Sequence, residues 1–385
     1  MGNFGLSRLT ERSALKYCVK LRSYKGMKNN YPLTVHYKSL PPLSYDPNPP
    51  FGSVCTPAVL SFDIKRGEST PAEIKLEELG NLTFSPFTNA LHYGQTIFEG
   101  MKAFRLDNNQ VGIFRLEDHA RRFHRSATLM DMTPIDVDLF NFCLKKYVDS
   151  VKEFVPTLKD HALYLRPFLM ANDPVIKLQS GKNFKFLVMS SIVGDYFASG
   201  STGSKILINK KLVRAFPGGT GEAKTAANYA TSLNALTYAQ SKGYEQVLYL
   251  DAMEHKYFEE LGGMNVFFVR EGKLITPPLN GQILKGITRE SILEIVGHLG
   301  FELEQKIYSI DEFVADCEAG KISEVFACGT AAVVNPIAAI GVENENDEIR
   351  NFEFSTSEVA LKIRKFLMAT QKGETEFSKK WLTIV

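Results

Sequence analysis

The sequence predicts an α/β protein of two domains, and three observations support that prediction. Strand-like and helical segments alternate from about residue 59 onward. The chain has 385 residues, 44% of them hydrophobic and 23% charged, which is enough for two domains with a core each. A Gly-, Ser- and Thr-rich stretch at 194–204 offers few side chains to bury. We therefore expect an N-terminal extension (1–50), a small α/β domain (51–193), a linker (194–204) and a larger domain (205–385).

The N-terminal extension differs in composition from the rest of the chain. Residues 1–28 carry seven basic residues and one acid, with apolar residues at helical-looking spacing. This profile is typical of an organellar transit peptide, and it fits equally a basic tail or an upstream start codon with Met27 as the natural beginning. Six prolines lie within residues 41–57. Because proline fixes φ and lacks an N–H donor, this stretch predicts an extended arm without a helix.

The small domain is predicted from residue 59 onward. Two glycines bracket a helical pattern in 89–100, and a turn at 107–109 joins 101–106 to 111–115 as a hairpin. Acidic residues near the start of the segment after the hairpin favour a helix there, since they offset the helix dipole. The predicted strands are 59–64, 101–106, 111–115, 162–167 and 184–190, and the further predicted helices are 116–130 and 139–154.

The larger domain is predicted as short strands with helices between them. One helix should follow Asn228 and stop at Gly243, and another should span 289–297, because apolar residues recur there at helical spacing. The predicted strands are 205–209, 246–250, 265–269, 273–276, 302–307 and 324–327.

Charge and cysteine content exclude several classes of function. The net charge is only +2 and the body of the chain has no basic run with interleaved aromatics, so no nucleic-acid partner is expected. No run of eighteen apolar residues occurs, so no membrane span is expected. The five cysteines are scattered and never spaced C-x-x-C, which argues against disulfides and a thiolate metal site. We expect a cytoplasmic protein, or a mitochondrial matrix protein if the N-terminus is a transit peptide.

Lys224 is the first candidate for chemistry, because it lies between a glycine-rich loop and a helix. Gly218, Gly219 and Gly221 allow positive φ and close approach. The plain interpretation is a solvated surface lysine. A second is a P-loop, since Gly218 to Thr225 nearly fits G-x-x-x-x-G-K-[ST] but has Ala223 where glycine is needed. A third is a Schiff-base lysine, whose free amine attacks a carbonyl carbon.

Two further segments are candidate anion sites. Residues 281–288 end in a Gly-x-Thr entry to a helix, where outward N–H groups and the Thr288 hydroxyl could bind an anion. An ordinary threonine N-cap explains the same pattern. The small-residue turn at 328–332 follows a strand and is a weaker candidate.

The motif Gly-Gly-Thr-Gly-x-x-Lys-x-x-x-Asn-Tyr at 218–229 resembles the lysine segment of the branched-chain amino acid aminotransferases. These are pyridoxal-phosphate enzymes of fold type IV. Further stretches resemble the family in the same order, so that the resemblance runs from about residue 51 to 381: 91–104, 121–127, 164–167, 259–265, 284–289 and 329–331. It implies a smaller N-terminal α/β domain and a larger C-terminal pseudo-barrel domain, joined by a short interdomain loop.

The resemblance also implies the residues that hold pyridoxal 5'-phosphate. Lys224 would carry the cofactor as a Schiff base and act as general base and acid. Glu260 would keep the ring nitrogen protonated, and Tyr229 would lie against the phenolic oxygen, although a core tyrosine fits its spacing equally well. The remaining residues would bind the phosphate: Arg122, Ile287, Thr288 and Thr330.

A substrate pocket follows from the same resemblance. Arg166 would admit a side-chain carboxylate, and backbone N–H groups near Ala331 would hold the substrate carboxylate, because Gly263 stands where some members have a threonine. The apolar walls would be Phe51, Tyr93, Tyr164 and Tyr196. In a homodimer, Tyr93, Ile176 and Leu178 would act across the subunit interface. Residues 332–335 replace the C-x-x-C of the mammalian enzymes, so we expect no thiol switch.

The activity implied is reversible amino transfer between L-leucine, L-isoleucine or L-valine and 2-oxoglutarate, in biosynthesis or degradation. Other fold type IV enzymes, such as a D-amino acid aminotransferase or an aminodeoxychorismate lyase, would share Lys224 and Glu260. A nucleotide-binding protein that uses the near-P-loop, and a noncatalytic binding protein, are the alternatives from other classes.

Overall fold

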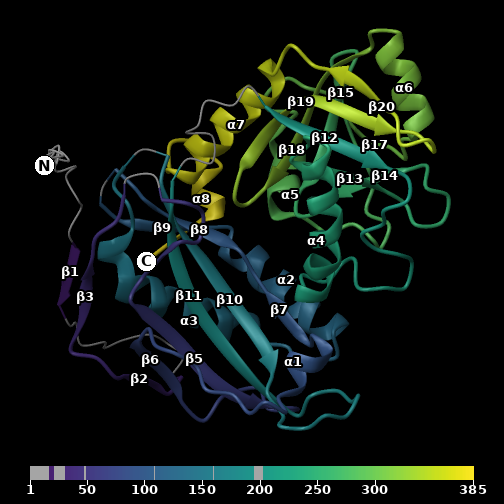
Figure 1. Ribbon diagram of the computed structural model, residues 1–385. Coiled ribbons are helices and arrows are strands. Elements are labelled where there is room, and N and C mark those ends of the chain that lie inside the picture. Colours follow the sequence, from purple (N-terminus) through teal and green to yellow (C-terminus); the bar gives the residue numbers. More distant parts are fainter. Residues whose placement is uncertain (1–16, 21–30, 47–48, 108, 159, 195–202) are drawn as a thin grey trace, which may run out of the picture.

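The computed structural model describes residues 17–20, 31–46, 49–107, 109–158, 160–194 and 203–385. Two large β-sheets form two lobes, one built from strands before residue 194 together with the C-terminal strand, and one built from the other strands after residue 203 (Figure 1). Helices cover both sheets, which confirms the predicted α/β class of a smaller N-terminal and a larger C-terminal part. The exact domain boundaries remain a prediction.

The first sheet has ten strands in the order β2-β6-β5-β11-β10-β8-β9-β21, with β4 paired to β11 and β7 paired to β10. Its centre is the antiparallel pair β10 and β11, in register from Ala162 opposite Val193 to Ala171 opposite Phe184. The strands are β2 (Leu33–Val35), β4 (Val54–Cys55), β5 (Ala58–Lys65), β6 (Ile74–Glu78), β7 (Thr96–Phe98), β8 (Met101–Arg105), β9 (Val111–Phe114), β10 (Ala162–Ala171), β11 (Asn183–Val193) and β21 (Leu382–Ile384).

Two helices pack on this sheet, α2 (Leu116–Leu129) and α3 (Val137–Val151), the latter continued by a 3₁₀ turn (Lys152–Phe154). Phe123 and Phe140 from these helices meet Phe186 of β11 in a fully buried aromatic cluster. Burial of large aromatic side chains gives this lobe a core of its own. The short helix α1 (Asn89–Tyr93) lies at the edge of the lobe, near the far end of β10 (Figure 1).

The second sheet has nine strands in the order β14-β13-β12-β19-β18-β15-β16-β17, with β20 paired to β19, and it curls as a half-barrel. Its strands β12, β13 and β19 are parallel, and most other pairs are antiparallel. The strands are β12 (Ser204–Asn209), β13 (Gln246–Leu250), β14 (Phe258–Leu261), β15 (Asn265–Arg270), β16 (Lys273–Thr276), β17 (Leu303–Gln305), β18 (Ile322–Gly329), β19 (Val333–Glu343) and β20 (Ile349–Glu353).

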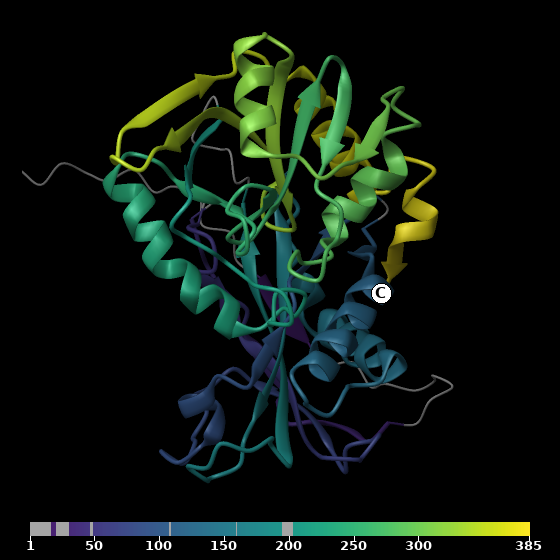
Figure 2. The same ribbon diagram turned by 90° about the vertical axis from the view of Figure 1, so that its right-hand side faces the viewer.

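Helices cover this sheet on more than one side. Residues of α5 (Ile287–Ile295) and α7 (Glu358–Gln371) pack in one hydrophobic cluster, and residues of α6 (Ile310–Glu318) pack in another. The helix α4 (Ala226–Ser241) lies along the outside of the molecule (Figure 2). The chain then passes through α8 (Ser378–Trp381) into β21, which pairs with β9 of the first sheet. The last residues therefore tie the two lobes together.

Most predicted elements are present, and the exceptions have physical reasons. The helical pattern across 89–100 is wrong beyond Tyr93, because Gly94 adopts φ +65° and ends α1, after which Thr96–Phe98 pairs with β10. The long strand β19 was not predicted, since Pro336 lies within it and proline argues against a central strand. The strands at 162–171 and 183–193 run further than their alternation indicated.

The N-terminal extension is described only in part. Residues 1–16 and 21–30 lie outside the described residues, and β1 (Tyr17–Lys20) between them pairs with β3 (Ser39–Leu43). The described part of the proline-rich arm contains short strands and no helix, as predicted. Within the described residues, no helix has the length and apolarity needed to cross a membrane.

Candidate active site

A cavity of about 180 Å³ lies where the two lobes meet, and both sheets contribute to it. β7, β10 and α2 supply side chains from the first lobe, while the Lys224 loop, β14, the start of α5 and the turn after β18 supply the rest. Eleven of the predicted site residues line this one cavity: Phe51, Arg122, Tyr164, Arg166, Lys224, Tyr229, Glu260, Ile287, Thr288, Thr330 and Ala331.

Lys224 enters the cavity from a segment that is bonded to the first lobe. Its backbone N–H donates to Ser126 Oγ at 3.0 Å, and its carbonyl accepts from the Phe98 N–H at 3.0 Å. The ammonium donates to the hydroxyl of Tyr229 at 2.7 Å and lies 4.9 Å from the Phe98 ring centroid. The amine thus stands in a partly apolar pocket rather than in bulk solvent, which removes the interpretation as a solvated surface lysine.

The glycine-rich loop before Lys224 is held by protein contacts. Asn228 at the start of α4 donates to the carbonyls of Thr220 and Ala223 at 2.8 and 2.9 Å. A Cβ at Gly221 would stand 2.3 Å from the carbonyl oxygen of Gln282. The glycine therefore permits close approach to another protein segment, whereas a P-loop needs its backbone N–H groups free for phosphate. This geometry disfavours the nucleotide-loop alternative.

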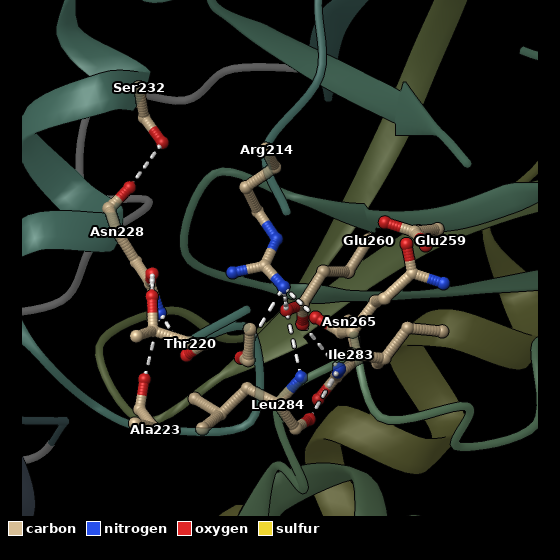
Figure 3. A network of polar contacts seen from close by, with 12 residues as sticks. Arg214, Thr220, Ala223, Asn228, Ser232, Glu259, Glu260, Asn265, Ile283 and Leu284 are labelled. Atoms are coloured by element: carbon tan, nitrogen blue, oxygen red, sulfur yellow. Dashed lines mark hydrogen bonds and ion pairs between the residues drawn. The ribbon is translucent and has the colours of Figure 1, made fainter. Parts of the chain in front are cut away.

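Glu260 is the centre of a buried polar network (Figure 3). Its carboxylate pairs with Arg214 at 2.8 Å and accepts from Asn265 Nδ2 at 2.8 Å and from the Leu284 N–H at 2.9 Å. Burial raises the pKa of Glu260, and Arg214 is the largest influence that opposes this rise. The network supplies a carboxylate that is fixed in position at one wall of the cavity.

Arg122 is fixed by a carboxylate of its own. Its guanidinium donates through two nitrogens to Glu99, at 2.6 and 2.8 Å, and through a third to the carbonyl of Lys285 at 3.1 Å. Glu99 also bonds the Nδ1 of His119 at 2.8 Å. Burial is the largest single influence and would raise the pKa of Glu99, but the charges and hydrogen bonds of Arg122 and His119 together outweigh it and hold that pKa well below its ordinary value. The result is a rigid cationic group at the cavity wall.

The start of α5 gives the cavity a second group of donors. Gly286 precedes the helix without a side-chain cap, and Ile287 and Thr288 of the first turn line the cavity. N–H groups at a helix start attract anions. A Cβ at Gly286 would stand 1.9 Å from Asn265 Oδ1, so only glycine fits between this turn and the Glu260 network.

Part of the cavity lining is aromatic. Phe51 and Tyr164 meet edge to face with centroids 4.9 Å apart. Arg166 donates to the Tyr164 hydroxyl at 3.1 Å, and its guanidinium lies 4.6 Å from the Phe98 ring centroid. This part of the lining therefore combines apolar surface with one cation.

Of the predicted substrate residues that the structure describes, Tyr93 is not among those lining the cavity. Tyr93 on α1 is 41% exposed, and Tyr196 lies outside the described residues. Ile176 and Leu178 are also exposed. They follow Pro174, which bridges Thr88 immediately before α1, so these side chains gather at one edge of the first lobe.

Sequence reasoning missed four contributors: Glu99, His119, Phe98 and Arg214. All four fall inside or beside segments that resemble the family, but nothing in their spacing assigns them a partner. Glu99 contacts the predicted Arg122, Arg214 contacts the predicted Glu260 and Phe98 contacts the predicted Lys224, whereas His119 contacts Glu99. Among the residues that the structure describes, no group of three or more His, Cys, Asp or Glu side chains could hold a metal ion.

The amino-transferase class IV family matches residues 96–340, a span that includes Lys224, Glu260 and Arg122. The chain belongs to the class IV aminotransferase family. It is 38% identical to the probable branched-chain-amino-acid aminotransferase of Staphylococcus aureus (strain MRSA252) over 336 residues, which is 87% of this chain and 93% of that protein.

Two further comparisons agree. The chain is 37% identical to branched-chain-amino-acid aminotransferase 2 of Bacillus subtilis (strain 168), covering 88% of this chain and 93% of that protein. A crystal structure of the branched-chain aminotransferase from the thermophilic archaeon Thermoproteus uzoniensis, with norvaline, superposes with a TM-score of 0.68 at 26% identity, over 85% of this chain and 99% of that one.

Proposed function

We propose that this enzyme transfers the amino group between L-leucine, L-isoleucine or L-valine and 2-oxoglutarate, with pyridoxal 5'-phosphate held at Lys224. The observation that supports it most is the convergence of Lys224, Glu260 and Arg122 on one cavity from three distant segments. The names of the S. aureus and B. subtilis relatives point to the same class of amino acids.

The residues present fit this cofactor by their chemistry. Arg122, the first N–H groups of α5 and the hydroxyls of Thr288 and Thr330 form a donor set for a dianionic phosphate. Glu260 provides the carboxylate that the ring nitrogen requires. When bound, the cofactor supplies an electron sink that stabilises negative charge at the substrate Cα. Tyr229 would lie against its phenolic oxygen.

The surroundings of Lys224 fit a role as general base and general acid. With the cofactor bound and the lysine amine free, Nζ of Lys224 would take the substrate Cα proton as general base and then donate that proton as general acid. Tyr229 accepts a hydrogen bond from this nitrogen and so fixes its direction. The ring of Phe98 beneath the amine limits its contact with water.

The aromatic part of the cavity lining, together with Arg166, explains how one pocket can bind two kinds of substrate. Phe51 and Tyr164 offer apolar surface to a branched side chain. Arg166, next to Tyr164, can pair with the side-chain carboxylate of glutamate or 2-oxoglutarate. The turn at Thr330 and Ala331 would hold the carboxylate that both substrates share.

The enzyme works as a homodimer in this proposal. Tyr93, Ile176 and Leu178 are exposed at one edge of the first lobe and would complete the pocket of the other subunit. Phe87 and Leu91 beside them are 54% and 63% exposed, which makes a larger apolar patch at the same edge. We expect sedimentation of the wild type as a dimer, and Leu178→Asp should give monomers with a raised KM for L-leucine. A fully active monomeric wild type would contradict this arrangement.

A substrate panel tests the activity itself. Wild type with added pyridoxal 5'-phosphate should convert L-leucine, L-isoleucine and L-valine to 2-oxo acids in repeated turnovers only when 2-oxoglutarate is present. D-Alanine and aminodeoxychorismate should not react. Turnover of either of these compounds, with none of the branched-chain substrates, would assign a different fold type IV activity.

A further inference from the structure

The turn between β18 and β19 is built in a strained way. Gly329 pairs with Val333, so Thr330, Ala331 and Ala332 form a three-residue connection. The residue that follows this connection lies in the left-handed region, where glycine is usual. Here the residue is Val333, with φ +62°, and this conformation is unfavourable for a β-branched side chain. Contacts from outside must keep the turn in this shape.

One contact that holds the turn comes from the first lobe. Lys102 lies on β8 of the first sheet, where it is paired with Tyr164 of β10. Its ammonium donates a hydrogen bond of 2.7 Å to the carbonyl oxygen of Ala331, and the side chain is only 8% exposed. A buried charged donor on a neutral carbonyl forms a strong bond, and losing it leaves that carbonyl unsatisfied.

We propose that Lys102 is a positioning residue for substrate: it fixes the Thr330–Val333 turn so that the N–H groups near Ala331 face the substrate carboxylate. The inference rests on the proposed function and deepens it. Lys102 lines a separate small cavity behind Ala331 and not the main one, so it acts through the turn. Its role is distinct from that of the cofactor ligands.

Lys102→Met tests this role, because methionine keeps the length of the chain and removes the donor. The KM for L-leucine and the KM for 2-oxoglutarate should both rise about tenfold or more, since both carry the shared carboxylate, while kcat changes much less. The dissociation constant of pyridoxal 5'-phosphate should rise less than either KM, because Thr330 is one of several proposed phosphate donors and the others lie outside the turn. Lys102→Arg keeps a charged donor and should recover most of the affinity.

A non-reacting ligand separates positioning from general damage. Binding of 4-methylvalerate, followed by the change in cofactor absorbance, should weaken about tenfold in Lys102→Met, whereas binding of the neutral 4-methylvaleramide should not change. Lys372→Met is the matched control. Lys372 lines the same small cavity but donates to Asp160 at 3.2 Å and does not touch the turn, so this variant should bind 4-methylvalerate like the wild type.

The outcomes distinguish a wrong role for Lys102 from a wrong proposed function. Unchanged KM values in Lys102→Met, equal losses in Lys372→Met, or equal weakening of acid and amide would overturn the role of Lys102 alone. A wild type that transaminates no branched-chain substrate would overturn the proposed function and this inference with it. If Lys102→Met does not fold, Lys102→Leu removes the same donor with a shorter apolar side chain, and the same comparisons decide the question with it.

Discussion

Arg214 and Glu260 form an ion pair of 2.8 Å in which both side chains are buried; Arg214 lies in the connection between β12 and α4 that also carries Lys224, and Glu260 lies on β14. The carboxylate would otherwise favour its neutral form, because burial raises the pKa of Glu260. Arg214 opposes that rise. The pair therefore favours the charged form of Glu260 at the cavity wall, where the cofactor ring nitrogen needs an anion.

Arg214→Met should remove this support. The pKa of Glu260 should rise further, so the acid limb of the pH–rate profile should move to higher pH, and activity should fall most on the acidic side. An uncompensated buried carboxylate should also cost about 3–5 kcal/mol in the free energy of unfolding. Urea unfolding and pH–rate profiles measure both effects. An unchanged acid limb would contradict the electrostatic role, and Arg214→Lys, which keeps the charge, should restore part of it.

Glu99→Gln should destabilise the protein by about 3–5 kcal/mol near pH 7, because Arg122 loses its buried counter-charge. The pKa of Glu99 is held well below its ordinary value, so its contribution is present above about pH 4.5 and is lost as pH falls through the lowered pKa. The difference between variant and wild type in urea unfolding should therefore narrow below that pH. Glu117→Gln on α2 is the control, since its ion pair with Arg121 is exposed. A pH-independent difference would argue against this account.

Glu259 should affect the pH dependence of stability with the opposite sign to Glu99, and Glu259→Gln should remove that effect. Glu259 is 1% exposed, burial raises its pKa to about 7, and its Oε2 has no hydrogen-bond partner. A raised pKa stabilises the folded state below the ordinary pKa, and this stabilisation is lost as pH rises through about 7. The wild type should thus lose about 2–3 kcal/mol between pH 5 and pH 8, and the variant should not. Parallel stability profiles for the two proteins would refute the assignment.

Gly221→Ala should displace the loop that carries Lys224. The new Cβ would stand 2.3 Å from the carbonyl oxygen of Gln282, so the backbone must shift, at a cost of about 1–3 kcal/mol. We expect a lower melting temperature and a reduced transamination rate. Gly297→Ala is the matched control, because its Cβ would meet no heavy atom within 4 Å. Equal effects of the two substitutions would show that the close approach at Gly221 does not matter.

Local patterns predicted most of the fold. The helix after Asn228 ends where Gly243 adopts φ +84°, and the hairpin around 107–109 is present. Both were predictable because a few adjacent residues determine a turn or a helix cap. The strand β19 was not predicted, because Pro336 is unfavourable within a strand. Its pairing with β18 and β12 makes this segment a strand in spite of the proline. Long-range pairing of this kind has no local signal.

In the site, too, the residues with local motifs were predicted and their long-range partners were not. Lys224, Glu260 and Arg122 were predicted from motifs that resemble a family, and the structure brings them to one cavity. Their supports were not predicted, since Glu99 and Arg214 become meaningful only when the fold places them against those residues. Physical chemistry says that buried charges need partners, but only the fold says which residues those partners are.

The most direct test of the account is the absorption spectrum of the protein with pyridoxal 5'-phosphate, before and after addition of L-leucine, beside the Lys224→Ala variant. We predict a visible band in the wild type that L-leucine bleaches, and no bleaching or turnover in the variant at the same L-leucine concentration. A wild type that stays colourless with the cofactor, or a Lys224→Ala variant that transaminates L-leucine at the wild-type rate, would contradict the central claim that Lys224 holds the cofactor and moves the proton.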